Sequence, residues 1–156
     1  MAPKLEKCFT MRAYLGKHDT VTLNTPGDAT TKVILPLEIG WVEGSGLKAD
    51  LMPGGSDWNS VSGPTFTPTK KVTLHCSRRS DSQRVFLGLV QTAVLSWSPE
   101  AKTTQFGDHT WFSQPIMETS DPAFKWVEST MFVGEGRFVV EERRTAVEYE
   151  IYKVVK

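Results

Sequence analysis

Alternating apolar and polar residues, interrupted at short intervals by turn-forming residues, are the feature that most constrains the fold of this chain. Between residues 70 and 77 every second side chain is apolar (Val72, Leu74 and Cys76), and a similar alternation runs from Cys8 to Leu15. Successive side chains of a strand point to opposite faces, so this period of two predicts half-buried strands. The chain therefore predicts a fold made of β-sheet.

Turn-forming residues separate the predicted strands. Gly44-Ser45-Gly46 predicts a hairpin turn, and Pro53-Gly54-Gly55-Ser56-Asp57 predicts a second, tighter break. The stretch from Gly16 to Thr31 is rich in Thr, Asp, Asn, Gly and Pro and predicts a loop or a weak edge strand. The strands are predicted at residues 8–15, 33–42, 47–52, 58–61, 70–77, 84–97, 109–119 and 146–155, with a further return to strand from Phe132.

One segment alone predicts a helix. Ser120-Asp121-Pro122 is typical of a cap followed by proline at an early helical position, and one or two turns are expected from Ala123 to Met131. In the alternative, this segment continues a strand, and Trp126 and Glu128 then share one face.

Many short strands with almost no helix and no βαβ alternation exclude a doubly wound fold. The remaining choice is a sandwich or a closed antiparallel barrel, and a barrel removes exposed sheet edges and leaves an interior. We predict an all-β protein in which residues 1–156 form a single closed antiparallel β-barrel with one or two short helices. A chain of 156 residues is the usual size of one domain.

The charge balance excludes several classes of partner. Lys and Arg number 18 and Asp and Glu number 18, so the net charge is zero, and nucleic-acid binding, which usually requires a basic excess, is not expected. No apolar run approaches the roughly 18 residues of a membrane span, and the polar N-terminal segment has no signal-peptide core. Two cysteines, Cys8 and Cys76, do not make a disulfide framework. We expect a soluble cytoplasmic protein, and the sequence is compatible with a homodimer.

The segment Leu51-Met52-Pro53-Gly54-Gly55-Ser56-Asp57-Trp58 resembles a known family motif. It is similar to the Leu-Pro-Gly-Gly-small-Asp-Trp turn of the small calycin-like β-barrel proteins catalogued as domain of unknown function number 3237. The resemblance continues, in order and spacing, through Phe112–Thr119, Phe124–Glu128, Phe132–Gly136 and Val147–Val155. It implies a barrel and does not imply a particular reaction.

Two departures from the family pattern concern the expected interior. Family members often carry a polar Arg/Asn-Arg-Gly run in the middle strand, where this chain has the mostly apolar residues 86–93. The asparagine that follows the helix tryptophan in the family is replaced by Glu128. The loss of charge from the middle strand favours an apolar, conjugated ligand.

No motif of known chemistry occurs in the chain. There is no nucleophile elbow, phosphate loop or dinucleotide fingerprint, and Gly134-x-Gly136 lacks the helix that a nucleotide site requires. The histidines His18, His75 and His109 lie far apart in sequence, so a metal site is not expected. We therefore predict no cofactor and no metal.

Three ionisable residues are candidates for proton transfer. Asp57 either accepts backbone hydrogen bonds in the glycine turn or lies at the barrel mouth as a proton acceptor. His75 lies on the polar face of its strand, where it is either exposed or a general acid or base that works near neutral pH. Glu128 is either solvated or the third such group.

The numerous aromatic residues predict either a packed core or the walls of a pocket. An eight-stranded barrel has room for one small ligand, and such pockets combine aromatic walls with a few polar groups. The predicted walls are Trp58, Trp111, Phe112 and Trp126.

Three functions fit this pattern. The first is a cofactor-free isomerase or cyclase that folds a hydrophobic secondary metabolite into a reactive conformer and moves a proton. The second is a non-catalytic barrel that carries or senses a small apolar molecule. The third is a partner-binding scaffold with a filled interior.

Overall fold

The computed structural model consists almost entirely of antiparallel strands. It describes the backbone of residues 1–24, 27, 30–62, 65–78, 84–93, 95–96 and 102–156, and the side chains of these ranges outside 62–101. The elements are β1 (Lys4–Leu15), β2 (Val21–Asn24), β3 (Thr30–Gly44), β4 (Leu47–Ser62), β5 (Thr65–Arg78), β6 (Arg84–Ala93), β7 (Leu95–Ser96), β8 (Trp111–Thr119), η1 (Pro122–Ser129), β9 (Phe132–Glu141) and β10 (Arg144–Val155).

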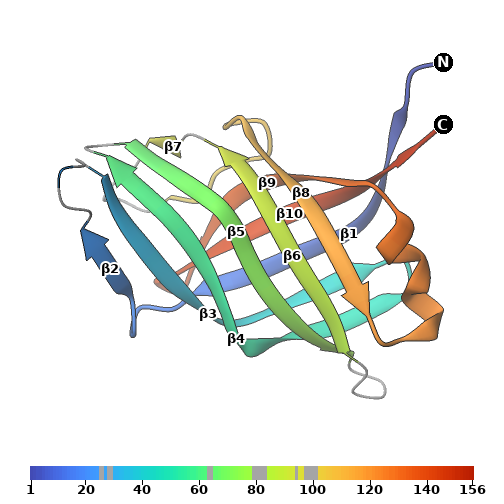
Figure 1. Cartoon of the computed structure of the whole chain (residues 1–156), viewed down its shortest axis with the longest axis horizontal. Coiled ribbons are helices and arrows are strands. Elements are labelled where there is room, and N and C mark those ends of the chain that lie inside the picture. Colours follow the sequence, from blue (N-terminus) through green and yellow to red (C-terminus); the bar gives the residue numbers. More distant parts are fainter. Residues whose placement is uncertain (25–26, 28–29, 63–64, 79–83, 94, 97–101) are drawn as a thin grey trace.

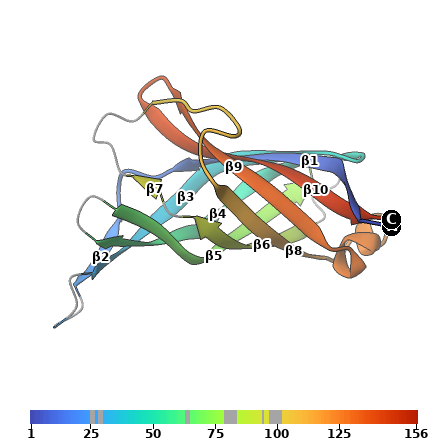
Figure 2. The same ribbon diagram turned by 90° about the horizontal axis from the view of Figure 1, so that it is seen from above.

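These strands form one curled antiparallel sheet. Within the described residues its hydrogen-bonded order is β1-β10-β9-β8-β6-β5-β4-β3-β2, with β7 paired to β5. The second half of β1 also pairs with β3, from Thr10–Glu43 to Leu15–Leu37. Figures 1 and 2 show the resulting half-barrel from two directions. The predicted all-β class is confirmed.

The segment Pro53-Gly54-Gly55-Ser56-Asp57 lies inside β4, so the predicted break at this segment is wrong. The register of β4 against β5 shifts between Met52 and Ser56, as in a bulge. Pro53 has no N–H to donate to a ladder, and Gly54 adopts a φ of +112°, which a residue with a side chain rarely adopts. The two residues bend the strand without ending it, and Asp57 follows directly after the bend.

The predicted short helix is confirmed as the 3₁₀ helix η1. The backbone N–H of Ala123 donates to the Asp121 carboxylate at 3.0 Å, and Pro122 occupies the first helical turn. Phe124 and Val127 are buried against the sheet. Figure 1 shows η1 at the end of the sheet where both chain termini lie. No helix in the described part of the chain has the length and apolar character needed to span a bilayer.

The core lies on the inner face of the sheet, where cross-strand neighbours from β1 and β10 are buried together. Residues directly opposite one another in antiparallel strands share a face. The buried pairs are Phe9 with Ile151, Met11 with Tyr149 and Ala13 with Val147, all of which are 1% exposed or less.

The outer face of the same strands carries a row of charged side chains centred on Glu148. Its carboxylate accepts hydrogen bonds from Arg12 Nε at 2.6 Å and from Arg137 Nη2 at 2.6 Å. The Arg12 guanidinium in turn lies over the Trp41 ring, 5.6 Å from its centroid. Glu148 is only 4% exposed, so this row joins β3, β1, β10 and β9 through one nearly buried charge.

The junction between β8 and β9 is the shortest of the main ladders in the described sheet. Two register pairs join these strands, Phe112 with Glu135 and Ser113 with Gly134, and η1 connects them along the chain. On its other side, β8 pairs with β6 along its whole length.

Candidate functional site

Four buried polar side chains lie on the inner face of the curled sheet. Asp57 and Asn59 come from β4 and are 4% and 1% exposed, whereas Trp58 between them is 45% exposed. Ser113 lies on β8 beside buried Trp111 and Pro115 in an alternating pattern of burial. Tyr149 lies on β10 and is fully buried. Strand alternation therefore aims these polar groups into the interior.

These groups leave hydrogen-bonding capacity unused. Asp57 Oδ1, both amide atoms of Asn59, Ser113 Oγ and the Tyr149 hydroxyl are buried without a hydrogen-bond partner. Buried polar groups are nearly always paired, and each unpaired group costs about 1–3 kcal/mol. Several such groups in one interior are therefore a binding-site candidate, because a bound molecule supplies what the protein leaves unpaired.

Burial raises the pKa of Asp57 from its ordinary value of 3.8 to about 6, and the Asn59 side chain acts in the opposite direction. The rise occurs because removal from water disfavours the charged carboxylate. Asp57 consequently titrates near the pH at which most enzymes work, as a general base or acid requires.

Burial, and then the negative charge of Asp57, raise the pKa of Tyr149 well above 10, while the Trp111 side chain, whose indole N–H can only donate, acts in the opposite direction. The Tyr149 hydroxyl therefore stays protonated at neutral pH and is a hydrogen-bond donor. Asp57 and Tyr149 come from strands that are not neighbours in the sheet, so the curl of the sheet brings the two side chains within electrostatic reach of one another. Neither the Asp57 Oδ1 atom nor the Tyr149 hydroxyl has a hydrogen-bond partner.

The Trp111 ring holds Tyr149 in place. The two rings meet edge to face, with centroids 5.5 Å apart and planes at 84°. Phe138 packs on the Trp111 ring at 4.8 Å. The Trp111 ring also lies over the bare backbone of Gly136, where a Cβ atom would come within 2.7 Å of the ring and 2.9 Å of Tyr149. Gly136 thus provides the space that Trp111 and Tyr149 occupy.

Replacing Gly136 with alanine is expected to destabilise the protein by roughly 1–3 kcal/mol, the usual cost of adding a methyl group to a filled core. The measurement is the free energy of unfolding in urea. Glu135→Ala, one position earlier on the partly exposed face of β9, is the matched control and is expected to change stability less. Equal stability of Gly136→Ala and the native protein would show that the aromatic pair moves aside at little cost.

Trp58 and Phe112 do not share the inner face with Asp57 and Trp111. Each is 45% exposed, because each directly adjoins a buried residue of its own strand and adjacent residues point to opposite faces. The structure therefore does not bring the four aromatic residues that were predicted as pocket walls onto one face of the sheet. The indole Nε1 of Trp58 donates to Ser56 Oγ at 2.9 Å on the outer face.

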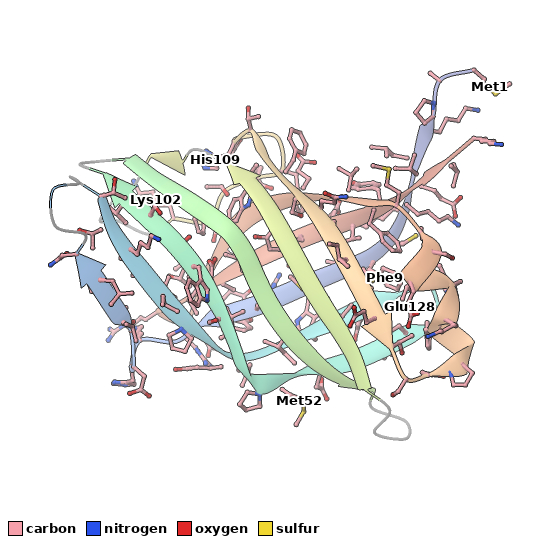
Figure 3. All side chains as sticks on the ribbon, in the orientation of Figure 1. Met1, Phe9, Met52, Lys102, His109 and Glu128 are labelled. Carbon is pink, nitrogen blue, oxygen red and sulfur yellow. The ribbon has the colours of Figure 1, made fainter. Side chains whose placement is uncertain are left out.

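Trp126 and Glu128 lie on η1 and diverge from one another, as expected for a helix. Trp126 stacks on Phe9, with ring centroids 5.9 Å apart, and closes the core at this end. Glu128 accepts hydrogen bonds from Lys125 Nζ at 2.8 Å and from the Thr119 N–H at 3.1 Å. The Lys125 ammonium, followed by the Thr119 N–H, lowers the pKa of Glu128. Figure 3 shows Glu128 at the η1 end of the molecule.

His75 pairs in register with Met52 of β4 and Phe86 of β6. Its side chain lies outside the described residues, so its predicted role in proton transfer stays a prediction. In the described part of the chain, His, Cys, Asp and Glu side chains do not gather in threes at any point where a metal ion would bind.

Sequence reasoning missed Asn59, Ser113 and Tyr149. The period of two could have indicated the first two, because Asn59 is two positions from Asp57 and Ser113 is two positions from Trp111. Tyr149 carries no such local signal, since it meets Asp57 only through the curl of the sheet.

Comparisons with known proteins agree on the fold. The family model described as "Protein of unknown function (DUF3237)" matches residues 3–154. No curated protein matches the chain.

Three solved structures resemble the chain along nearly its whole length, and at these identities the likeness shows the fold alone. A conserved protein of unknown function from Rhodopseudomonas palustris is 18% identical with a TM-score of 0.76, covering 99% of both chains. A beta-barrel like protein from Acinetobacter baumannii is 21% identical with a TM-score of 0.72, covering 99% of this chain and 98% of that one. A protein from Penicillium herquei described as an enzyme is 16% identical with a TM-score of 0.57, covering 99% of this chain and 96% of that one.

Proposed function

This chain belongs to the DUF3237 family, whose function is unknown, and from its own site we propose that it is a cofactor-independent isomerase or cyclase. Its substrate in this proposal is a small hydrophobic secondary metabolite held against the inner face of the curled sheet. Such a reaction needs a shaped apolar surface and one group that moves a proton, and it needs no oxidant or cofactor.

The observation that carries the proposal is the state of Asp57. A carboxylate that is 4% exposed, with one oxygen unpartnered and a pKa raised to about 6, costs the protein stability. Ionisable groups with strongly shifted pKa values cluster at functional sites. We assign Asp57 as the proton-transferring group, while His75 and Glu128 remain predicted alternatives.

The proposal includes closure of the sheet into a barrel of eight strands. The ladder between β1 and β3 supports closure, because it links the first strand of the sheet order to a strand near its other end. A barrel of this size has room for side chains and one small ligand. Trp111 is then one wall of the ligand site.

A second function, non-catalytic binding of a small apolar molecule, is favoured by a different observation. The unpaired atoms of Asn59 and Ser113 satisfy a ligand equally well whether or not the ligand reacts. The two functions differ in what Asp57 does, since a carrier does not need the carboxylate to change its protonation state.

The proposal is tested by looking for an enzyme-dependent conversion of a substrate into a product of the same mass. The protein is incubated with a panel of conjugated ketones and polyenes, and a product of equal mass and altered retention is sought by liquid chromatography and mass spectrometry. Asp57→Asn is expected to lower the rate of conversion by about 10²–10⁴-fold, the usual contribution of a positioned acid or base.

Asp50→Asn is the matched control, because Asp50 is an exposed carboxylate on the same strand, and it is expected to keep the native rate. An Asp57→Asn variant that converts the panel at the native rate would contradict the assignment of Asp57. Binding of panel members without any conversion would favour the carrier.

A further inference from the structure

The Tyr149 hydroxyl is a buried donor that the proton-transfer role of Asp57 does not use. Tyr149 is fully buried, and its hydroxyl has no hydrogen-bond partner. Its ring is fixed by the edge-to-face contact with Trp111, which in turn lies against Gly136. A donor held in one orientation and left unpaired is suited to bind an acceptor atom of a ligand.

We propose that Asp57 and Tyr149 together bind a ketone substrate and transfer a proton within it, an inference that rests on the proposed function. The Tyr149 hydroxyl donates a hydrogen bond to the carbonyl oxygen, and the Asp57 carboxylate faces the carbon next to the carbonyl. Both side chains are buried and come from strands that are not neighbours in the sheet, and Asp57 Oδ1 and the Tyr149 hydroxyl have no partner in the protein.

The step balances within the substrate and the two side chains. The carboxylate of Asp57 takes a proton from the carbon next to the carbonyl, so a C–H bond breaks and an O–H bond forms on Asp57. The electron pair of the C–H bond becomes the π bond between the two carbons, and the π pair of the carbonyl moves onto its oxygen. This oxygen becomes an enolate oxygen and accepts a stronger hydrogen bond from Tyr149. Where the ketone carries a carbon–carbon double bond next to the deprotonated carbon, the enolate is a dienolate, and Asp57 returns the proton to its far carbon. This completes an isomerisation to the conjugated ketone with no net gain or loss of electrons.

The charged and polar residues that the structure describes in the interior favour a neutral carbonyl compound over an anion. The buried polar residues of the described chain include no Lys or Arg that would bind a carboxylate or phosphate. The nearby cations Arg12 and Arg137 are held on the outer face by Glu148. An amine would pair with Asp57 and leave the Tyr149 hydroxyl without an acceptor, whereas a ketone satisfies this donor.

The roles of the two side chains follow from their protonation. Burial keeps the pKa of Tyr149 well above 10, so this side chain donates and does not act as a base. With a pKa of about 6, Asp57 is mostly ionised at pH 7 and can accept the proton. The remaining unpaired groups, Asn59 and Ser113, offer positions for further oxygen atoms of the substrate.

The experiment uses two probes of matched shape. 2-Tetralone is a ketone with an acidic adjacent carbon, and its exchange of hydrogen for deuterium in D₂O is followed by NMR. 2-Naphthol resembles the corresponding enol, and its binding is followed by fluorescence. The variants are Asp57→Asn, Tyr149→Phe and the control Tyr152→Phe, since Tyr152 is on the same strand and its hydroxyl already bonds to Glu150.

Tyr149→Phe is expected to slow enzyme-dependent exchange at least tenfold and to weaken 2-naphthol binding about tenfold. Asp57→Asn is expected to abolish enzyme-dependent exchange, and Tyr152→Phe is expected to match the native protein within a factor of two. Because the Tyr149 hydroxyl has no partner, Tyr149→Phe is expected to melt no lower than the native protein, which shows that its fold is intact.

Three outcomes would overturn the inference, and they are distinguishable. If deuterium exchange of 2-tetralone is lost in Asp57→Asn but unchanged in Tyr149→Phe, Tyr149 does not belong to the site, and the proposed function still stands. Native protein that neither accelerates the exchange of 2-tetralone nor binds 2-naphthol in a saturable manner overturns this inference, and with it the role of Asp57 toward ketones. Tighter binding of a matched amine, 2-aminotetralin, than of 2-tetralone, measured for both by competition with 2-naphthol, would assign the site to amines.

Discussion

Replacing Asp57 with asparagine is expected to stabilise the protein by about 3 kcal/mol at pH 7 while removing its proposed activity. The pKa of Asp57 is raised from 3.8 to about 6 by burial. One pKa unit corresponds to about 1.4 kcal/mol, so the difference between these two values gives the size of the effect. The introduced amide carries no charge, so its burial does not incur this cost.

The stabilisation depends on pH in a definite direction. Below pH 3.8 the carboxyl is protonated in both the folded and the unfolded chain, so its ionisation costs nothing. Between pH 3.8 and about 6 the unfolded chain loses its proton first, so the free energy of unfolding falls as the pH rises. Above pH 6 the full cost is present. The difference between Asp57→Asn and the native protein should therefore grow from pH 4 to pH 6 and then stay level.

Urea unfolding at half-unit steps from pH 3.5 to 8 measures this difference. For a chain of this length, 3 kcal/mol corresponds to a rise in melting temperature of about 6–12 °C. Asp50→Asn, an exposed change on the same strand, is expected to show no such dependence. A difference that is constant across the whole range would mean that Asp57 titrates normally. A residue that lowers stability and is retained for activity is the usual trade-off at a functional site.

Replacing Glu148 with glutamine is expected to destabilise the protein by roughly 3 kcal/mol. Glu148 is 4% exposed and its carboxylate is shared by Arg12 and Arg137, which come from β1 and β9. Removing one partner of a nearly buried ion pair leaves the other charges uncompensated, which typically costs 3–5 kcal/mol. The two arginines are about one fifth exposed or less, so water relieves part of that cost.

Glu141→Gln is the matched control for this change. Glu141 also bonds to Arg12, at 2.8 Å, but its side chain is 48% exposed, so its replacement is expected to leave the melting temperature nearly unchanged. The two variants are compared by thermal unfolding in low and in high salt. A similar decrease in melting temperature for both variants would contradict the central place of Glu148 in the row of charged side chains on the outer face.

The strands were predictable from the sequence, because a strand with one buried face has apolar side chains at every second position. It was wrong at Pro53–Asp57, since proline and glycine occur both in turns and in bulges and local sequence does not separate the two. The family motif at this segment thus marks a bend within β4. The helix at Pro122 was predictable from its cap, which is a local signal.

The candidate site was predictable only in part. Asp57 and Trp111 were identified, but Trp58 and Phe112 were assigned to the same pocket although each directly adjoins one of these buried residues. Tyr149 was missed because its nearness to Asp57 depends on strands that are far apart in the sequence. Contacts of this kind arise from the curl of the whole sheet and leave no local pattern.

The pairing of β1 with β10 sets the order in which this protein can be completed during synthesis. The inner side chains Phe9 and Met11 are covered by Ile151 and Tyr149, which emerge from the ribosome roughly 140 residues later. Pairing over so long a separation is slow, because a large loop must close before any contact is gained. One edge of β1 can pair with β3 early in synthesis, but the edge that pairs with β10 stays open until the last strand is made. The unfinished sheet therefore exposes part of its apolar inner face until β10 arrives.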